Sequence, residues 1–268
     1  MNRKLQLLSL CTLGAGVFGC SEIDKLREDI EKITNQTVLS GLVIGTEEFS
    51  HPLIDSDALS FELNESRIFL ASAGVDASDL NPEGIAGAVV DFESATNGTL
   101  TYADDGEGFY ALNQDDGLEY VDQEMVTIIF EDDAGTHSIS NVLPSSAEFD
   151  LPDDHAAGRD VTIDLTGQGF TSYLVAVTRF PDGELVYSNE PTSFSDIYDL
   201  SHAETDVTEV VIPGDSFAEE GIYAIALSAL VGNETEDMVE LNTILSSLLA
   251  GKVKTDVICV PMCPTIPE

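Results

Sequence analysis

Basic residues are scarce in this sequence of 268 residues, and their scarcity is the first restriction on its function. Ten Lys and Arg stand against 50 Asp and Glu, which gives a formal net charge of −40. Between Ile33 and Gly158 the only basic residue is Arg67. Binding to nucleic acid or to anionic lipid headgroups requires clustered Lys and Arg. We therefore expect no nucleic-acid partner and no direct contact of the folded region with an anionic membrane surface.

Tryptophan is absent, and only four cysteines are present. No two cysteines are spaced so that they could bridge two sheets, which excludes an antibody-type domain. Hydrophobic residues make up 43% of the chain. The chain can therefore form a buried core, unlike a disordered acidic tail. Its length is that of one or two domains.

Residues 1–19 have the layout of a secretory signal. Arg3 and Lys4 precede an apolar stretch of 14 residues, from Leu5 to Phe18. As a helix this stretch would be about 21 Å long, which is short of the roughly 30 Å hydrocarbon core of a bilayer. We expect a cleaved signal peptide and not a permanent membrane-spanning helix.

The end of this segment, Val17-Phe18-Gly19-Cys20, resembles the lipobox of bacterial lipoproteins, in which an aliphatic residue and a small residue precede a cysteine. The resemblance implies cleavage after Gly19, a lipid on Cys20 and anchoring in a bilayer through several acyl chains. Ser21 follows the cysteine, whereas an Asp there is associated with retention in the inner membrane. We therefore expect a lipid anchor in the bacterial outer membrane, and we retain an ordinary cleaved signal as the alternative.

Two cysteines remain in the mature chain apart from Cys20, because Cys11 lies in the signal segment. Cys259 and Cys263 form an even pair in an exported protein, which favours a disulfide bond. A zinc site is the weaker alternative, because it needs three or four ligands and no histidine follows His202.

Residues 20–36 have helical periodicity. Ile23, Leu26, Ile30 and Ile33 form one apolar stripe. Two heptads are too few for a stable coiled coil. We predict a short helical tether that carries the lipid and packs against the domain that follows it.

After Thr37 the pattern changes to short runs with a period of two. Val161–Leu165 and 223–228 alternate in this way, and the turn 180–183 (Phe-Pro-Asp-Gly) separates two strand-like runs. Such spacing is typical of antiparallel sheets. The aperiodic stretch 143–158 divides the remainder into regions of similar length, so we predict two β-sandwich domains, at 37–148 and 149–268.

The second region resembles fibronectin type III and immunoglobulin-like modules of bacteria. The residues that carry the resemblance are the strand 161–165, the hairpin 173–187 and the run 211–227, in which Phe217 stands six residues before Tyr223. The first region is similar to cell-surface sandwich repeats over 85–92, 106–110 and 125–130. The resemblance implies a mainly β fold with two tandem antiparallel β-sandwiches.

One segment does not suit a plain sandwich. In the run from Asp237 to Leu249, the apolar side chains of Met238, Leu241, Leu245 and Leu248 lie on one helical stripe, and Gly251 follows as a stop signal. We predict one helix here, near the C-terminus, covering a sheet edge or face.

A catalytic constellation is not evident. The four histidines stand apart in the sequence, at positions 51, 137, 155 and 202, and no zinc-protease, nucleophile-elbow or phosphate-loop motif occurs. Paired carboxylates could serve a hydrolase, but 50 acids make such pairs uninformative. We expect no enzyme, and we keep an unrecognised carboxylate-based hydrolase as the less favoured alternative.

Acidic turns in the first region are the one candidate for a metal site, because Ca²⁺ needs several converging oxygen ligands. The candidate residues are Asp104, Asp105, Glu107, Asp115 and Asp116. We favour the alternative of a solvated acidic surface, since acids occur along the whole chain. No other cofactor is expected. We predict a non-enzymatic binding or spacer module with a protein or glycan partner, and the alternative is a calcium-dependent binding module.

The acidity predicts a dependence of stability on salt. Removal of Arg3 and Lys4 with the signal would leave a charge of −42, two units below the −40 of the whole chain. We expect the melting temperature to rise between 0.01 and 0.1 M salt, as the Debye length falls from about 30 to about 10 Å. A bland surface responds equally to sodium and calcium at matched ionic strength. A saturable calcium effect, lost in D104N/D105N/E107Q, would show a specific site instead.

Overall fold

The computed structural model describes residues 35–54, 64–74, 83–132, 135–189, 200, 205–239 and 242–263. The expected signal peptide, Cys20 and nearly all of the predicted tether lie outside these residues. The last two residues of the predicted tether, Asn35 and Gln36, already belong to the first strand.

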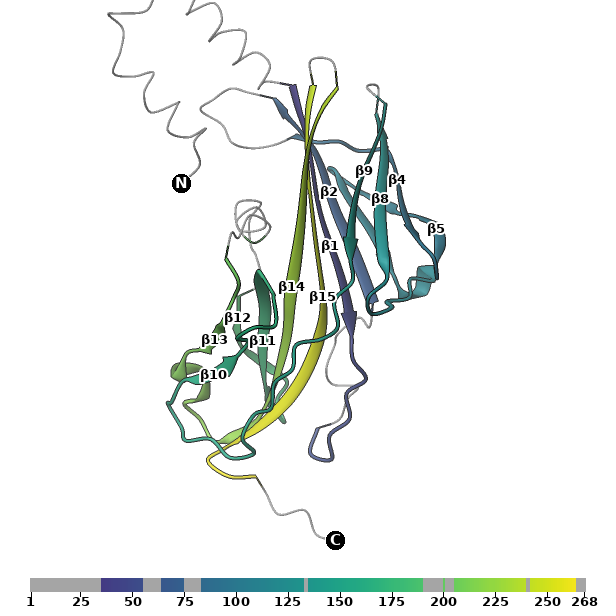
Figure 1. Cartoon of the computed structure of the whole chain (residues 1–268). Coiled ribbons are helices and arrows are strands. Elements are labelled where there is room, and N and C mark those ends of the chain that lie inside the picture. The colour runs from purple at the N-terminus through teal and green to yellow at the C-terminus, as the bar shows by residue number, and fades with distance from the viewer. Residues whose placement is uncertain are drawn as a thin grey trace, which may run out of the picture.

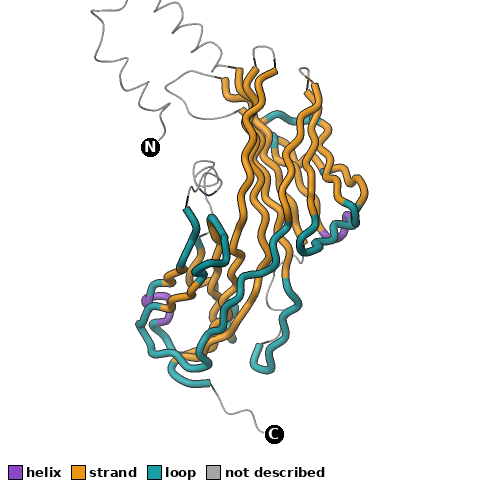
Figure 2. Tube along the Cα trace, in the orientation of Figure 1, coloured by secondary structure: helices purple, strands orange, loops and turns teal. Residues whose placement is uncertain are grey.

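The described chain is mainly β, as predicted, and its strands form three sheets (Figures 1 and 2). The strands of the first region are β1 (Asn35–Thr46), β2 (Asn64–Gly74), β3 (Glu83–Gly84), β4 (Val89–Ser94), β5 (Gly98–Thr101), β6 (Ala103–Gly106), β7 (Phe109–Asn113), β8 (Met125–Asp132) and β9 (Gly135–Val142). Those of the second are β10 (Val161–Asp164), β11 (Ser172–Phe180), β12 (Glu184–Ser188), β13 (Glu209–Ile212), β14 (Gly221–Val239) and β15 (Asn242–Val260). Two short 3-10 turns, η2 (Gln114–Asp116) and η3 (Gly214–Phe217), complete the elements.

A nine-stranded sheet runs through the whole molecule. Its order is β12-β11-β14-β15-β1-β2-β7-β6, and β3 pairs with β2. A four-stranded sheet, β5-β4-β8-β9, and a two-stranded sheet, β10-β13, pack against it. All strand pairs are antiparallel except β1 and β15, which run in the same direction. This parallel pair was not expected from the sequence.

The hairpin β14-β15 gives the molecule its length. Each strand has 19 residues, which corresponds to about 60 Å at 3.3 Å per residue. The register runs from Gly221 opposite Val260 to Val239 opposite Asn242 without a shift. Figure 1 shows the two strands passing from a lower lobe, which contains β10 to β13, into an upper lobe, which contains β4, β5, β8 and β9.

This hairpin contributes to two large cores on one of its faces and, through Ala224 and Val257, to a smaller hydrophobic cluster on the other. Leu248 and Ala250 pack in the core between the large sheet and the four-stranded sheet. Ile258 and Val260 pack in the core beneath the two-stranded sheet. Side chains alternate with a period of two, so these four residues lie on the same face of β15. Both cores therefore lie on one face of a shared sheet, and the expected tandem sandwiches are joined by continuous strands.

The helix predicted between Asp237 and Leu249 is wrong. Its described residues, 237–239 and 242–249, form the end of β14 and the start of β15. Gly251, which was expected to end the helix, lies inside β15, where a Cβ would be 2.4 Å from Leu230 Cδ2 and 2.9 Å from the carbonyl oxygen of Ala229. Pairing with β14 and β1 satisfies the backbone here, so tertiary contacts override the local helical stripe.

The local predictions for the second region are confirmed. β10 and β13 pair antiparallel, and the turn 180–183 joins β11 to β12, with Gly183 at a φ of +68°. The rings of Phe217 and Tyr223 meet edge to face at 5.3 Å. The hydroxyl of Tyr223 donates to the carbonyl oxygen of Glu219 at 2.7 Å, in the manner of the tyrosine corner of β-sandwich domains.

The sharing of β15 between the cores predicts that a C-terminal residue stabilises the N-terminal sandwich. Leu248 is fully buried there, so Leu248→Ala should lower the free energy of unfolding by about 2–5 kcal/mol and speed hydrogen exchange in β4 and β8. Leu185, which is 58% exposed, supplies the control Leu185→Ala, expected to change little. Unchanged exchange in β4 and β8 would contradict the shared core.

Candidate functional site

A cleft lies where the two lobes meet on the core face of the large sheet. Its volume is about 440 Å³, and its lining is apolar or neutral apart from one carboxylate. The lining residues are Gln123, Val142, Pro144, Ser145, Ser146, Glu148, Gln168, Phe170 and Val231. They come from both predicted domains, so the cleft exists only because the lobes are joined.

Asn141, near the end of β9, joins the strands beside the cleft by hydrogen bonds. Its side-chain amide donates to the carbonyl oxygens of Val231 and Leu248, both at 2.9 Å. The asparagine is only 8% exposed, and it connects the four-stranded sheet to both strands of the long hairpin. Its neighbour Val142 is 41% exposed and points its apolar surface into the cleft.

The wall of the cleft is formed by the segment that runs between the lobes after β9 (Figure 2). The side-chain amide of Gln168 donates to the carbonyl oxygen of Glu148 at 2.9 Å and accepts from its backbone N–H at 2.8 Å. The hydroxyl of Ser146 donates to the carboxylate of Glu47. These bonds hold the backbone of the wall while the Glu148 side chain stays exposed.

Tyr120 ties the same segment to the first lobe. Its hydroxyl donates to the carbonyl oxygen of Pro144 at 2.7 Å, and Lys252 lies 5.8 Å from its ring centroid while pairing with Asp122 at 2.8 Å. Burial, followed by the charge of Asp122, raises the pKa of Tyr120 well above its usual value. The ring therefore stays neutral and serves as a fixed support.

The C-terminal end of β15 holds the other end of the segment. Lys254 donates to the carbonyl oxygen of Phe149 at 2.5 Å. The backbone N–H of Cys259 donates to the carbonyl oxygen of Asp153 at 2.8 Å. A disulfide bond joins Cys259 to Cys263, and the Cys263 N–H donates to the Asp154 carboxylate at 3.0 Å. The disulfide therefore lies against the segment, at the edge of β15 beyond the region paired with β1.

The acidic residues considered as a calcium site do not converge. Asp104 lies in β6 and accepts from the backbone N–H groups of Gly87 and Gly106, at 2.6 and 2.7 Å. Asp115 and Asp116 belong to η2, at the opposite end of β7. Within the described ranges, no three His, Cys, Asp or Glu side chains are grouped closely enough to hold a metal ion.

The other two residues considered as calcium ligands are Glu107 and Asp105. Glu107 lies in the β6-β7 turn at a φ of +53°, where its carbonyl oxygen passes so close to Gly84 that a Cβ on Gly84 would be 1.7 Å from it. The side chain of Asp105 lies outside what the structure describes.

None of the three described histidines lines the cleft. His51 stacks with Phe49, and His137 is buried against Phe130, with ring centroids 5.0 Å apart. The Nε2 atom of His155 is 2.8 Å from the carbonyl oxygen of Arg159. His202, like Cys20, lies outside the described residues.

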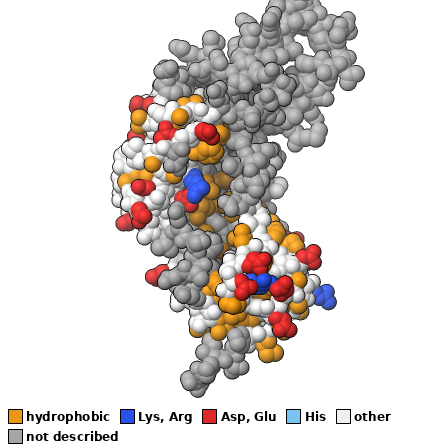
Figure 3. All heavy atoms as spheres, turned by 180° about the vertical axis from the view of Figure 1, so that it is seen from behind, with side chains coloured by type: hydrophobic (Ala, Val, Ile, Leu, Met, Phe, Trp, Pro, Cys, Tyr) orange, Lys and Arg blue, Asp and Glu red, His pale blue; other side chains and the backbone are white. Residues whose placement is uncertain are grey.

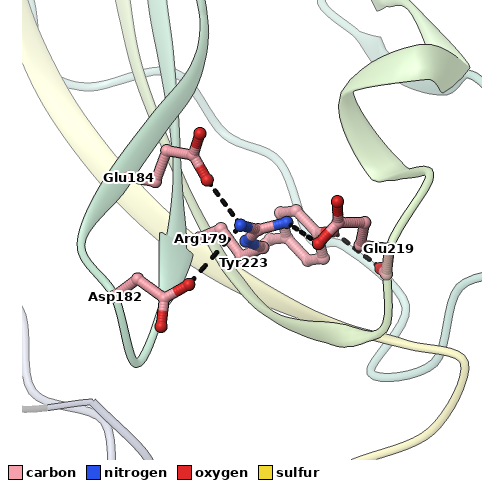
Figure 4. A network of polar contacts seen from close by, with 5 residues as sticks. All are labelled: Arg179, Asp182, Glu184, Glu219 and Tyr223. Carbon is pink, nitrogen blue, oxygen red and sulfur yellow. Dashed lines mark hydrogen bonds and ion pairs between the residues drawn. The ribbon is translucent and has the colours of Figure 1, made fainter.

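An ionic cluster around Arg179 was not foreseen from the sequence (Figure 4). The Arg179 side chain is 16% exposed, and its guanidinium contacts the carboxylates of Asp182, Glu184 and Glu219. Partial burial lowers the pKa of Arg179, but the three negative charges outweigh it and raise the pKa above its usual value. The only signal in the sequence was a lone basic residue just before an acidic turn.

This cluster connects the β11-β12 hairpin to the loop before β14, and it neutralises acids that would otherwise repel one another. Figure 3 shows the molecule from behind the view of Figure 1. On that face acidic side chains are spread over both lobes, with few basic side chains among them. No helix among the described residues is long and apolar enough to cross a membrane.

Comparisons with known proteins give a distant likeness in structure alone. No family model matches the chain, and no curated protein matches it either. The chicken CNTN1 FN1–FN3 domains match with a TM-score of 0.21 and 11% identity, over 75% of this chain and 64% of that one. A 1.5-MDa bacterial ice-binding adhesin matches with a TM-score of 0.20 and 12% identity, over 86% of this chain and 66% of that one.

The chain thus spans less than two thirds of either solved structure. The likeness is a distant similarity to fibronectin type III and immunoglobulin-like β-sandwich domains. At TM-scores near 0.2 it carries no argument about function, which must come from the geometry of the chain itself.

The cleft predicts a measurable role for Asn141. Asn141→Ala removes the two hydrogen bonds to the hairpin and a third, from the backbone N–H of Val142 to Asn141 Oδ1, and it leaves two carbonyl oxygens without this donor, so it should lower the free energy of unfolding by about 1–3 kcal/mol. Hydrogen exchange should rise at Val231 and Leu248 before it rises elsewhere. Asn233→Ala is the matched control, because Asn233 also donates to a carbonyl oxygen, that of Ser140, but is exposed. Equal effects of the two variants would contradict the assigned role.

Proposed function

We propose that this chain is a lipid-anchored lipoprotein of the bacterial envelope or cell surface that acts as a non-enzymatic spacer and binding module. The observation that carries the proposal is the path of the described chain. It enters the large sheet at the start of β1, at one end of the long axis, and leaves it after β15, at the other (Figure 1). A molecule with this path holds what lies before β1 and what lies after β15 far apart.

The N-terminal end of this path leads directly to the expected anchor. Asn35 begins β1, only 15 positions after Cys20. A lipid on Cys20 would therefore attach the upper end of the molecule to the bilayer, and the second lobe would project away from it. The negative surface favours this orientation, since anionic headgroups repel the folded region.

The binding part of the proposal rests on the cleft between the lobes. Its apolar Val142, Val231 and Pro144, together with exposed Ser145 and Glu148, suit a neutral protein segment or a glycan better than an anionic ligand. The hydrogen bonds of Asn141 and Gln168 hold the walls in place, so that little order must be gained on binding.

Fractionation of cells tests the anchor. Cys20→Ser should move the protein from the membrane fraction to the soluble fraction, because the thiol is the attachment point of the lipid. Cys11→Ser is the matched control, since Cys11 lies in the segment expected to be removed, and it should leave the protein in the membrane. Mass spectrometry of the wild-type N-terminus should find an acylated Cys20. An unmodified chain starting elsewhere would refute the lipoprotein assignment.

The non-enzymatic part of the proposal has its own test. Purified protein beginning at Ser21 should not turn over a panel of esterase, glycosidase and protease substrates. Turnover that one alanine substitution abolishes would overturn the proposal in favour of the hydrolase alternative.

A further inference from the structure

We propose that the parallel pairing of β1 with β15 is a mechanical clamp, which keeps the molecule folded under tension between its two ends. The inference rests on the spacer part of the proposed function, because a spacer comes under tension when what lies before β1 and what lies after β15 are pulled apart. Its physical basis, however, is the strand geometry alone.

The two strands through which such a force would enter and leave are direct neighbours. β1 pairs with β15 over eleven residues, from Gln36 opposite Thr243 to Thr46 opposite Val253. The backbone N–H of Glu47 adds a bond of 2.9 Å to the carbonyl oxygen of Val253. No described strand lies between them.

The direction of the strands decides how this pairing is loaded. Force on β1 acts at Asn35, its first residue, and force on β15 acts at Val260, its last. Since the strands run in parallel, pulling these points apart slides one strand along the other. All the backbone hydrogen bonds of the ladder then stretch together, and no single bond can break ahead of its neighbours.

Neither strand can leave the sheet by another route. β1 is paired along its other edge with β2, and β15 is paired with β14 over its full length. The clamp is also covered by core, because Leu39 and Val43 of β1 and Leu248 of β15 are each at most 1% exposed. Sliding would therefore break hydrogen bonds and expose apolar surface in the same step.

The same molecule contains an internal contrast. Gly221 and Val260 lie opposite each other at one end of the antiparallel hairpin β14-β15. A force that separates these two points peels the strands apart one pair at a time, although the pairing is longer. The force needed to separate two paired strands therefore depends on the direction of pulling and not on the number of residues that pair.

Single-molecule force measurements test the clamp. The chain beginning at Ser21 is attached first through Ser21 and Glu268, and then, as E220C, through position 220 and Glu268, which loads the hairpin as a zipper. We expect the first geometry to unfold at a force several-fold higher, because the rate of forced unfolding depends on the barrier along the pulled direction. Equal forces, or a lower force in the first geometry, would overturn the proposal.

A reversible cross-link locates the resistance. Ser40 and Ser247 are register partners, with hydroxyl oxygens 3.4 Å apart, which suits a disulfide in S40C/S247C. When it is oxidised, force passes through the bond and along the already extended strand β15, so the high-force peak should disappear. Reduction should restore it, and the reduced variant is its own folding control. A peak of unchanged force after oxidation would overturn the proposal.

The force measurement tests the clamp separately from the lipid anchor and from the ligand of the cleft. Failure of the C20S fractionation would remove the proposed function and leave the measured clamp in place. Equal forces in the two geometries would remove the clamp and leave the lipoprotein proposal standing.

Discussion

The pairing of β14 with β15 is the interaction on which the remainder of the structure depends. Nineteen residues of each strand pair without a shift in register, and the two large hydrophobic cores are built on the same face of this hairpin. The parallel strand β1 and the segment that lines the cleft use the free edge of β15 in succession. A break in this hairpin would therefore affect both lobes and the cleft together.

The prediction from sequence succeeded where the signal was local. The alternation in 161–165, the turn 180–183 and the spacing of Phe217 and Tyr223 are each patterns within a few neighbouring residues, although the strand at 161–164 pairs with the distant β13.

The prediction failed where partners are distant in sequence. Residues 237–249 have a helical stripe, and nothing local shows that β1, about 200 positions earlier, provides the strand that this segment needs. The cleft was missed for the same reason, because its lining is drawn from positions 123 to 231. The acidic turns are ambiguous in the sequence, since Asp104 and Asp116 accept hydrogen bonds from nearby backbone N–H groups, and acids with such local roles resemble ligand clusters in a sequence.

The parallel contact between β1 and β15 also has a consequence for the order of folding. The strand that begins the sheet finds its neighbour only after more than 200 further residues have been made. Contacts of such high sequence separation slow folding, because the chain loses much entropy before they form. During synthesis or export the first sandwich would lack Leu248 and Ala250, leaving one edge of β1 open until the last strand arrives. A protein of this topology has most to gain from factors that protect unpaired strands while it is still incomplete.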